Sequence, residues 1–146
     1  MGRSIQTLIS IGNLALTYWD QGRLEEAEEL ELQVMETRTR VLGPEHPDTL
    51  LSISNLASTY IDQGRWKDAE ELFEQVIETS KTKLGVDHPD TLISMDNLAF
   101  TWKSQSRNAE AINLMRECVQ LRHRILGVSH PLYLSSLQAL ARWEAV

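Results

Sequence analysis

The sequence has few of the residues that would build a disulfide framework or a membrane span. It contains one cysteine in 146 residues, so no internal disulfide can form, and a single thiol fits a reducing compartment. No apolar run approaches the roughly 20 residues that a helix needs to cross a bilayer. The first residues, MGRSIQTLIS, lack the basic and then apolar order of a signal peptide. We therefore expect a cytoplasmic protein with no membrane contact.

Positive charge is also scarce. Fourteen Lys and Arg residues face 21 Asp and Glu residues, which gives a net charge of −7 and a pI near 5.1. A protein that binds nucleic acid needs a basic face to neutralise phosphates, so this balance argues against such a partner. The hydrophobic share of 42% is ordinary for a globular protein, and the length suits one domain over residues 1–146.

A repeat of 42 residues runs through the whole chain. HPDTL begins at residues 46 and 88, and HPLYL begins at residue 130. NLA recurs at 13, 55 and 97, QGR at 21 and 63 with QSR at 105, and LG at 42, 84 and 126. A fixed period of this size is typical of a solenoid, in which each unit buries its apolar face against its neighbours.

Each copy has the pattern of two helices. In the second copy, apolar residues follow helical spacing over about 47–62, where Pro47 suits the first turn. A tight reversal at 63–65 contains Gly64, and a second helical pattern over about 66–84 should end at Gly85. No stretch shows the alternation of a half-buried strand, so the sequence predicts an all-α protein.

The register divides the chain into three copies and a last helix. We expect the first copy at about 4–45, the second at 46–87, the third at 88–129 and a capping helix at 130–146, about seven helices in all. Ser4, Ile5 and Gln6 replace the His-Pro-Asp start in the first copy. The same register predicts core positions at Leu14, Tyr18, Tyr60, Trp102, Leu137 and Ala141, among others.

Leu56, Ala57, Tyr60, Ala69 and Phe73 stand at offsets that resemble the tetratricopeptide repeat, whose usual period is 34 residues. The longer version with HPDTL, NLA and QGR resembles the repeats of kinesin light chains and of the sensor arrays of NLR-like signalling proteins. This resemblance implies a right-handed superhelix whose first helices line a concave groove for a peptide or a partner helix. The groove residues that it implies are Asn13, Leu16, Trp19, Asn55, Ser58, Ile61, Asp62, Asn97, Phe100 and Lys103.

Two kinds of polar residue recur once per copy. Asn13, Asn55 and Asn97 have amides that could pair with the backbone of an extended peptide, although they could equally fix the register between repeats. The recurring histidines could suggest metal ligands; they are His46, His88 and His130. Equivalent positions in a helical stack, however, lie about 10 Å apart. Zinc needs its nitrogen ligands within roughly 2 Å, so capping or loop packing is the better interpretation.

Three single residues invite a separate interpretation. Trp19 falls on the implied groove stripe as a binding anchor, or else it packs against a preceding repeat. Cys118 takes the slot of Val34 and Val76 and should be a small buried hydrophobe. Glu31 stands where Phe73 and Met115 stand in the other copies, so a carboxylate is either solvated there or buried at a cost.

The predicted function is a non-catalytic scaffold that binds a peptide or partner helix. No nucleotide-binding loop, serine-hydrolase motif or zinc-protease motif is present, so we expect no enzyme, no cofactor and no metal. Asp20 and Asp62 in the implied groove favour a neutral or basic partner over an acidic one. The alternative is an assembly module that self-associates weakly end to end, with Arg116, Arg122 and Arg124 as its basic end, or that forms part of a sensor array.

Overall fold

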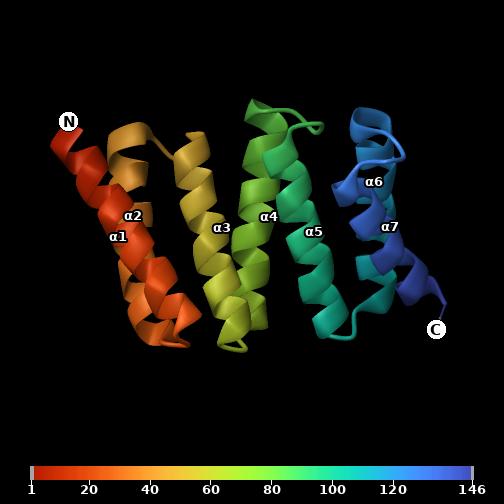
Figure 1. The fold of residues 1–146 in the computed structure, drawn as a ribbon, viewed down its shortest axis with the longest axis horizontal. Helices are drawn as coiled ribbons and strands as arrows, with labels where there is room; N and C mark the ends of the chain where they lie inside the picture. The colour runs from red at the N-terminus through yellow and green to blue at the C-terminus, as the bar shows by residue number, and fades with distance from the viewer. Residues whose placement is uncertain (1, 146) are drawn as a thin grey trace. The chain divides into compact units, whose positions relative to one another are not determined.

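The computed structural model describes the backbone of residues 2–145 and the side chains of residues 7–145. Seven α-helices follow one another and no strand occurs among these residues, so the predicted all-α repeat of helix pairs is confirmed (Figure 1). The helices are α1 (Gly2–Asp20), α2 (Leu24–Leu42), α3 (Pro47–Asp62), α4 (Trp66–Lys83), α5 (Pro89–Ser104), α6 (Asn108–Leu126) and α7 (Pro131–Glu144).

The recurring histidines begin three of the helices. His46, His88 and His130 are the N-cap residues of α3, α5 and α7, and each Nδ1 accepts a hydrogen bond of 3.1 Å from the backbone N–H two residues later. This bond satisfies one of the donors that the first turn of a helix leaves free, and the following proline loses no bond there. The predicted capping role is therefore confirmed. In α1, which has no such cap, the helix extends back to Gly2.

Tight turns join the two helices of each copy. Gly64 adopts a φ of +77°, and the N–H of Arg65 bonds to the carbonyl of Tyr60 at 2.8 Å. Ser106 holds the same place in the third copy with a φ of +63°. An L-residue in this left-handed region meets a clash that glycine avoids, which costs roughly 1–2 kcal/mol. Ser106 therefore carries backbone strain that Gly64 does not.

The chain divides into two compact units. In the first, Met1–Leu72, α2 packs against both α1 and α3. Its buried residues include Leu8, Ala15, Ala27, Val34, Leu50, Ile53, Leu56 and Ala57. The small Ala27 and Ala57 let helix backbones approach closely, while the leucines fill the space beside them.

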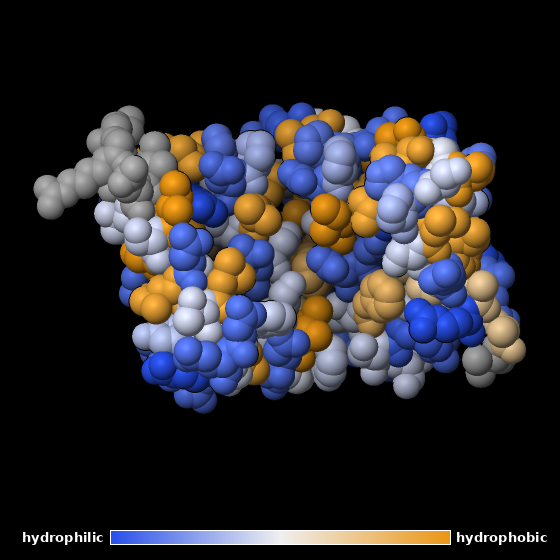
Figure 2. Space-filling model, in the orientation of Figure 1, coloured by the Kyte–Doolittle hydropathy of each residue, from blue (hydrophilic) through white to orange (hydrophobic). Residues whose placement is uncertain are grey.

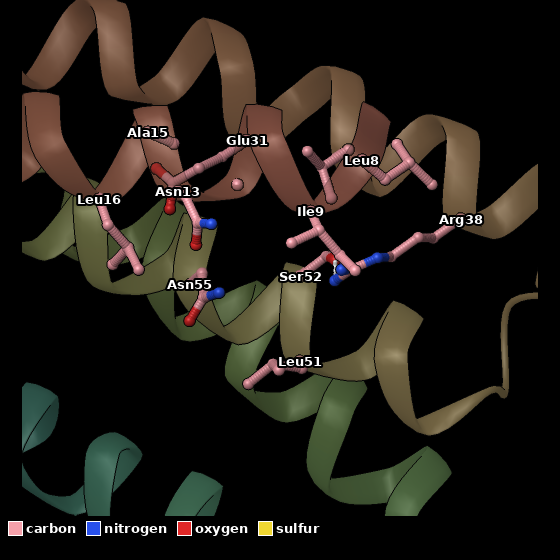
Figure 3. Close-up of a pocket in the computed structure, with 12 residues that line it drawn as sticks. Leu8, Ile9, Asn13, Ala15, Leu16, Glu31, Arg38, Leu51, Ser52 and Asn55 are labelled. Atoms are coloured by element: carbon pink, nitrogen blue, oxygen red, sulfur yellow. Dashed lines mark hydrogen bonds between the residues drawn. The ribbon is translucent and has the colours of Figure 1, made fainter. Parts of the chain in front are cut away.

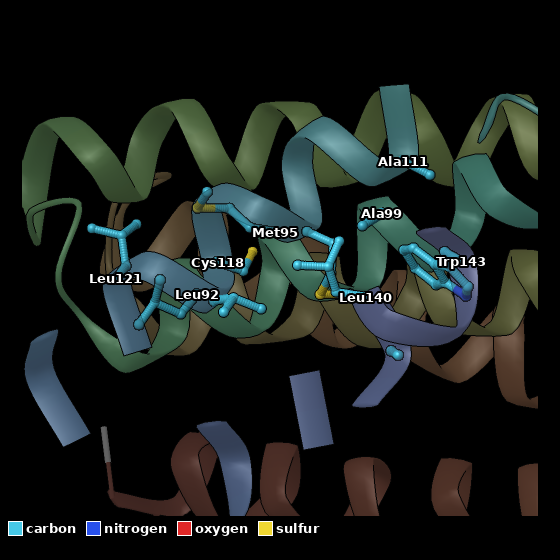
Figure 4. Close-up of a cluster of buried hydrophobic side chains, with 11 residues drawn as sticks. Leu92, Met95, Ala99, Ala111, Cys118, Leu121, Leu140 and Trp143 are labelled. Carbon is cyan, nitrogen blue, oxygen red and sulfur yellow. The ribbon is translucent and has the colours of Figure 1, made fainter. Parts of the chain in front are cut away.

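In the second unit, Phe73–Val146, α6 packs against α5 and α7. Figure 4 shows side chains from these three helices converging on one cluster, with Met95 and Leu140 beside Cys118. The thiol of Cys118 is fully buried, as predicted, and burial together with the nearby Asp96 raises its pKa. Such a thiol is a packing group and a poor nucleophile.

Some expected core positions are on the surface. Leu14, Leu137 and Ala141 are exposed, whereas their counterparts in the second and third copies are buried. The predicted core positions for these three residues were therefore wrong, because the repeat register alone does not determine which side chains a neighbouring helix covers.

The recurring aromatic positions are half-buried, although the register predicted a core. Tyr18, Tyr60 and Trp102 each lie under the guanidinium of the arginine that follows in QGR or QSR. The distances from the guanidinium carbon to the ring centroid are 4.2, 4.0 and 5.0 Å, which is the range of a cation–π contact. The turn thus covers its own aromatic ring.

Candidate functional site

A cavity of about 210 Å³ lies in the first unit between α1, α2 and α3. Three of the residues that the resemblance assigns to a groove, Asn13, Leu16 and Asn55, meet in its wall (Figure 3). The wall is mostly apolar, with a few polar groups among the aliphatic side chains. Its residues are Leu8, Ile9, Gly12, Asn13, Ala15, Leu16, Glu31, Val34, Arg38, Leu51, Ser52 and Asn55.

The cavity has a simple origin in the repeat. Glu31 occupies the position at which Phe73 and Met115 are fully buried in the other copies, and its side chain fills less of that position with apolar volume. Gly12 stands where Ser54 and Asp96 stand, so it contributes no side chain to the opposite wall. Both exchanges remove volume from the same place, and the first copy is left hollow there.

Glu31 is held at the edge of this hollow by a hydrogen bond. The hydroxyl of Thr59 on α3 donates to its Oε1 at 2.5 Å. Burial is the main cause that raises the pKa of Glu31 to about 7; the charges of Glu28 and Asp62 act in the same direction, and the bond from Thr59 opposes the change. A carboxyl group that changes its charge near neutral pH therefore borders the cavity.

Arg38 forms the other polar end of the wall. Its Nη1 donates to Ser52 Oγ at 2.7 Å and to the carbonyl of Asp48 at 3.2 Å (Figure 3). The same arrangement recurs in the third copy, where the buried Arg122 donates to Ser136 Oγ at 2.5 Å. The sequence interpretation did not foresee this contact for either arginine, although Arg38 and Arg122 stand at the same repeat position, as do Ser52 and Ser136.

Trp19 and Asp62 are brought together next to this region. The indole Nε1 of Trp19 on α1 donates to Asp62 Oδ2 on α3 at 2.5 Å, and the ring remains 41% exposed. The contact makes Trp19 a partly exposed anchor that a following helix holds in place. Ser58 and Ile61 are half-buried and do not line the cavity.

The remaining predicted groove residues, Asn97, Phe100 and Lys103, belong to the second unit. The exposed Phe100 meets Trp143 edge to face, with ring centroids 5.0 Å apart and an angle of 81° between the planes. Lys103 Nζ donates to Asn108 Oδ1 at 3.0 Å, and Asn97 is half-buried. Since α7 carries Trp143, the last helix supports Phe100 from one side.

The predicted basic end of the chain is largely neutralised. Arg122 is buried, and its guanidinium pairs with Asp96, whose pKa burial raises while Arg122 opposes the change. Arg116 lies 2.9 Å from Glu144, and Arg124 lies 3.2 Å from Asp87. The placement of Arg122 on an outer basic face was wrong, because it serves as an internal bridge from α6 to α5 and α7.

The surface beside the cavity offers apolar contacts broken by polar groups. In Figure 2, the face on which α1 lies in front of α2 carries separate hydrophobic patches among hydrophilic side chains. Large side chains of α1 and α3 that are at least 40% exposed include Ile9, Leu16, Trp19 and Leu51. Exposed apolar anchors beside amide groups can bind another polypeptide through both burial and hydrogen bonds.

Neither a metal cluster nor a membrane-spanning helix is found in the described part of the chain. Within residues 2–145, no cluster of three or more His, Cys, Asp or Glu side chains is placed to hold a metal ion. Across the same residues, no helix has the length and apolar character needed to traverse a bilayer.

Paired helices in a 42-residue register, with a small-residue contact in each pair, define a helical repeat protein. The tetratricopeptide repeat (TPR) family matches residues 5–82 and 50–117, and the chain belongs to this family. No curated protein matches the sequence. Its repeats are of the kinesin light chain type, because the solved structures that it resembles carry such repeats.

The chain is similar to a Podosopora anserina candidate kinesin light chain with nearly identical TPR-like repeats. This relative is solved in two forms, one of them a single-residue variant, and each shares 34% identity with a TM-score of 0.85. The match covers 94% of this chain and 65% of that protein, so the chain spans about two thirds of its length. BtubC (BKLC) from P. vanneervenii has the same fold, with 18% identity, a TM-score of 0.79 and coverage of 92% and 55%.

Proposed function

We propose that this chain binds an extended peptide of a partner protein along the exposed faces of α1 and α3. TPR proteins act as protein-binding scaffolds, and this membership supports the general class. The observation that carries the finer proposal is the cavity in which Asn13 and Asn55 lie beside Leu16 and Leu51. Amides there would pair with the peptide backbone, while one apolar side chain of the peptide enters the cavity.

The charge around the cavity favours a neutral or basic peptide. Asp62 lies at the rim and holds Trp19, and Glu31 borders the cavity itself. Arg38 is the cation of the wall, and two oxygens of the chain already accept from its Nη1. A peptide with carboxylates on both sides of its anchor would face Glu31 and Asp62 with like charge, which disfavours it.

The test uses peptides selected from a random display library against the folded chain. Asn55→Ala leaves backbone groups of the peptide unpaired and should weaken binding by about 1–3 kcal/mol. Leu16→Ala should weaken it comparably through lost burial. The control replaces two exposed carboxylates of α4, Glu71→Lys with Glu78→Lys, and should leave affinity nearly unchanged.

Calorimetric titration gives the affinities, and circular dichroism checks that every variant folds. Full affinity in both Asn55→Ala and Leu16→Ala, with loss in the α4 control, would move the binding site to the outer helices. Such a result would refute the proposal.

A second candidate function is end-to-end assembly. The exposed apolar residues of α7, among them Leu134 and Leu137, favour it, because their counterparts in earlier copies are covered. Light scattering across a concentration series tests it. A mass that rises with concentration in the wild type and stays monomeric in Leu137→Lys would support assembly, and a constant monomer mass would refute it.

A further inference from the structure

Glu31 shares the cavity with the apolar side chains that would hold a peptide anchor. Its carboxyl lies where the other copies place the fully buried Phe73 and Met115. An unfilled cavity leaves the carboxylate accessible to water, which can solvate its charge. An apolar side chain in the cavity would exclude that water, and an ionised carboxylate without a counter-ion is costly to bury.

We propose that insertion of an uncharged apolar side chain into this cavity requires Glu31 to take up a proton, so that partner binding weakens as the pH rises through neutrality. This inference rests on the proposed function, since it assumes that the anchor of a peptide occupies the cavity. The partner chemistry is specific: one uncharged aliphatic or aromatic side chain, flanked by backbone that the asparagines can bind.

Among the charged groups around Glu31, no cation is placed to neutralise its carboxylate, so neutralisation requires a proton. On α2, Glu28 is paired with Arg65 at 2.8 Å, and Arg38 donates to Ser52 and to a backbone carbonyl. On α3, Asp62 accepts from Trp19, and both Asp62 and Glu28 disfavour ionisation of Glu31.

The cavity residues that α1 contributes are uncharged: Leu8, Ile9, Gly12, Asn13, Ala15 and Leu16. Among the described residues no ion pair joins Glu31 to a cation, and its recorded partner is the hydroxyl of Thr59. A proton is therefore the group that can neutralise Glu31 when water leaves the cavity.

The size of the cavity argues for a single side chain as the occupant. Its volume of about 210 Å³ is below the roughly 300–1,000 Å³ of a small-molecule site. The third copy fills the equivalent position with Met115, and the second fills it with Phe73. In the other copies, a side chain of the protein itself fills this position. In the first copy, the side chain of a bound peptide would fill it instead.

The expected pH dependence follows from linkage. If only the neutral form of Glu31 accepts the anchor, the dissociation constant rises with the ionised fraction of the free protein. With a pKa of about 7, this predicts about tenfold weaker binding at pH 8 than at pH 6. The weakening sets in near pH 7 and continues above it, in a range where an ordinary glutamate is already fully ionised.

The experiment uses two probes that carry one apolar side chain and no charge, N-acetyl-leucinamide and N-acetyl-phenylalaninamide. Each is titrated into the folded chain at pH 6 and pH 8, and methyl and amide NMR shifts report both the location and the dissociation constant. We expect shifts at Ile9, Leu16 and Leu51, with affinity about tenfold lower at pH 8.

Three variants test whether Glu31 causes the pH dependence of probe binding. Glu31→Gln keeps a neutral group of the same shape, so its affinity should be equal at the two pH values. Glu36→Gln, an exposed carboxylate on the same helix, should keep the tenfold difference. Glu31→Phe should fill the cavity and abolish the shifts.

Absence of cavity shifts with both probes at pH 6 would overturn the inference, as would equal affinity at the two pH values. A pH dependence that survives in Glu31→Gln would also overturn it. The proposed function could still stand in each case, because selected peptides would remain sensitive to Asn55→Ala and Leu16→Ala. Conversely, proton-dependent probe binding with peptides insensitive to both changes would reject the proposed function alone.

Discussion

The raised pKa of Glu31 makes the stability of the fold itself depend on pH. Folding moves this pKa from 4.5 to about 7, so between these values the folded state holds more protons than the unfolded state. The free energy of unfolding therefore falls as the pH rises from 4.5 to 7. Below 4.5 both states are protonated and above 7 both are ionised, and Glu31 adds no slope there. Glu31→Gln should remove this dependence.

The size of the effect can be worked from the two pKa values. The difference between 4.5 and about 7 corresponds to on the order of 3 kcal/mol. Glu31 is half-buried, and water that reaches its carboxyl screens part of this. We therefore expect Glu31→Gln to be about 2–3 kcal/mol more stable than the wild type at pH 8 and close to it at pH 4.5.

Urea unfolding followed by circular dichroism at pH 4.5, 6, 7 and 8 measures this difference. Glu36→Gln, on the exposed side of α2, is the matched control and should follow the wild type at every pH. Parallel stability curves for the wild type and Glu31→Gln would refute the reasoning, because they would show that Glu31 is as solvated as an ordinary surface carboxylate.

Three further predictions follow from an ion pair, a backbone conformation and an N-cap hydrogen bond. Arg122→Ala leaves a buried partner unpaired and should lower the unfolding free energy by about 3–5 kcal/mol, whereas Arg124→Ala in the same turn, 65% exposed, should cost at most about 1 kcal/mol. Ser106→Gly should stabilise by about 0.5–1 kcal/mol by relieving a positive φ, and Gly64→Ala should destabilise by about 1 kcal/mol for the opposite reason. His88→Ala should cost about 1 kcal/mol through loss of the N-cap bond. Urea unfolding of each variant at pH 6 provides the comparison.

The fold was predictable because every copy of the repeat carries the same local sequence signals for the starts and ends of its helices. The predicted helices over 47–62 and 66–84 correspond to α3 at Pro47–Asp62 and α4 at Trp66–Lys83. Their ends were readable from the proline after each histidine and from Gly85, whose φ is +101°. These signals act within a few residues, so they do not depend on what packs against the helix.

Burial was harder to predict at positions whose neighbours change along the array. Leu14 and Leu137 share register with buried leucine and methionine positions, yet their own side chains are exposed. The bridge from Arg122 to Asp96 and Ser136 was missed because its members lie 26 and 14 residues from Arg122. The periodicity of one helix carries no information about contacts between side chains of different helices.

The candidate site was predictable only in part. Asn13, Leu16 and Asn55 were expected on one surface, and the cavity brings them together. The exchange of Phe73 for Glu31 marked an unusual position, but the hollow also needed Gly12 on the opposite helix. A cavity formed by two coincident losses of volume becomes visible only when the helices are placed.

The most direct test of peptide binding is an NMR map of the complex. One selected peptide is titrated into the isotopically labelled chain, and the residues whose amide or methyl signals move are assigned. Binding along the exposed faces of α1 and α3 predicts changes at Asn13, Leu16, Leu51 and Asn55, with the exposed Glu71 of α4 unaffected. Changes confined to the outer faces of α2, α4 and α6 would contradict the account.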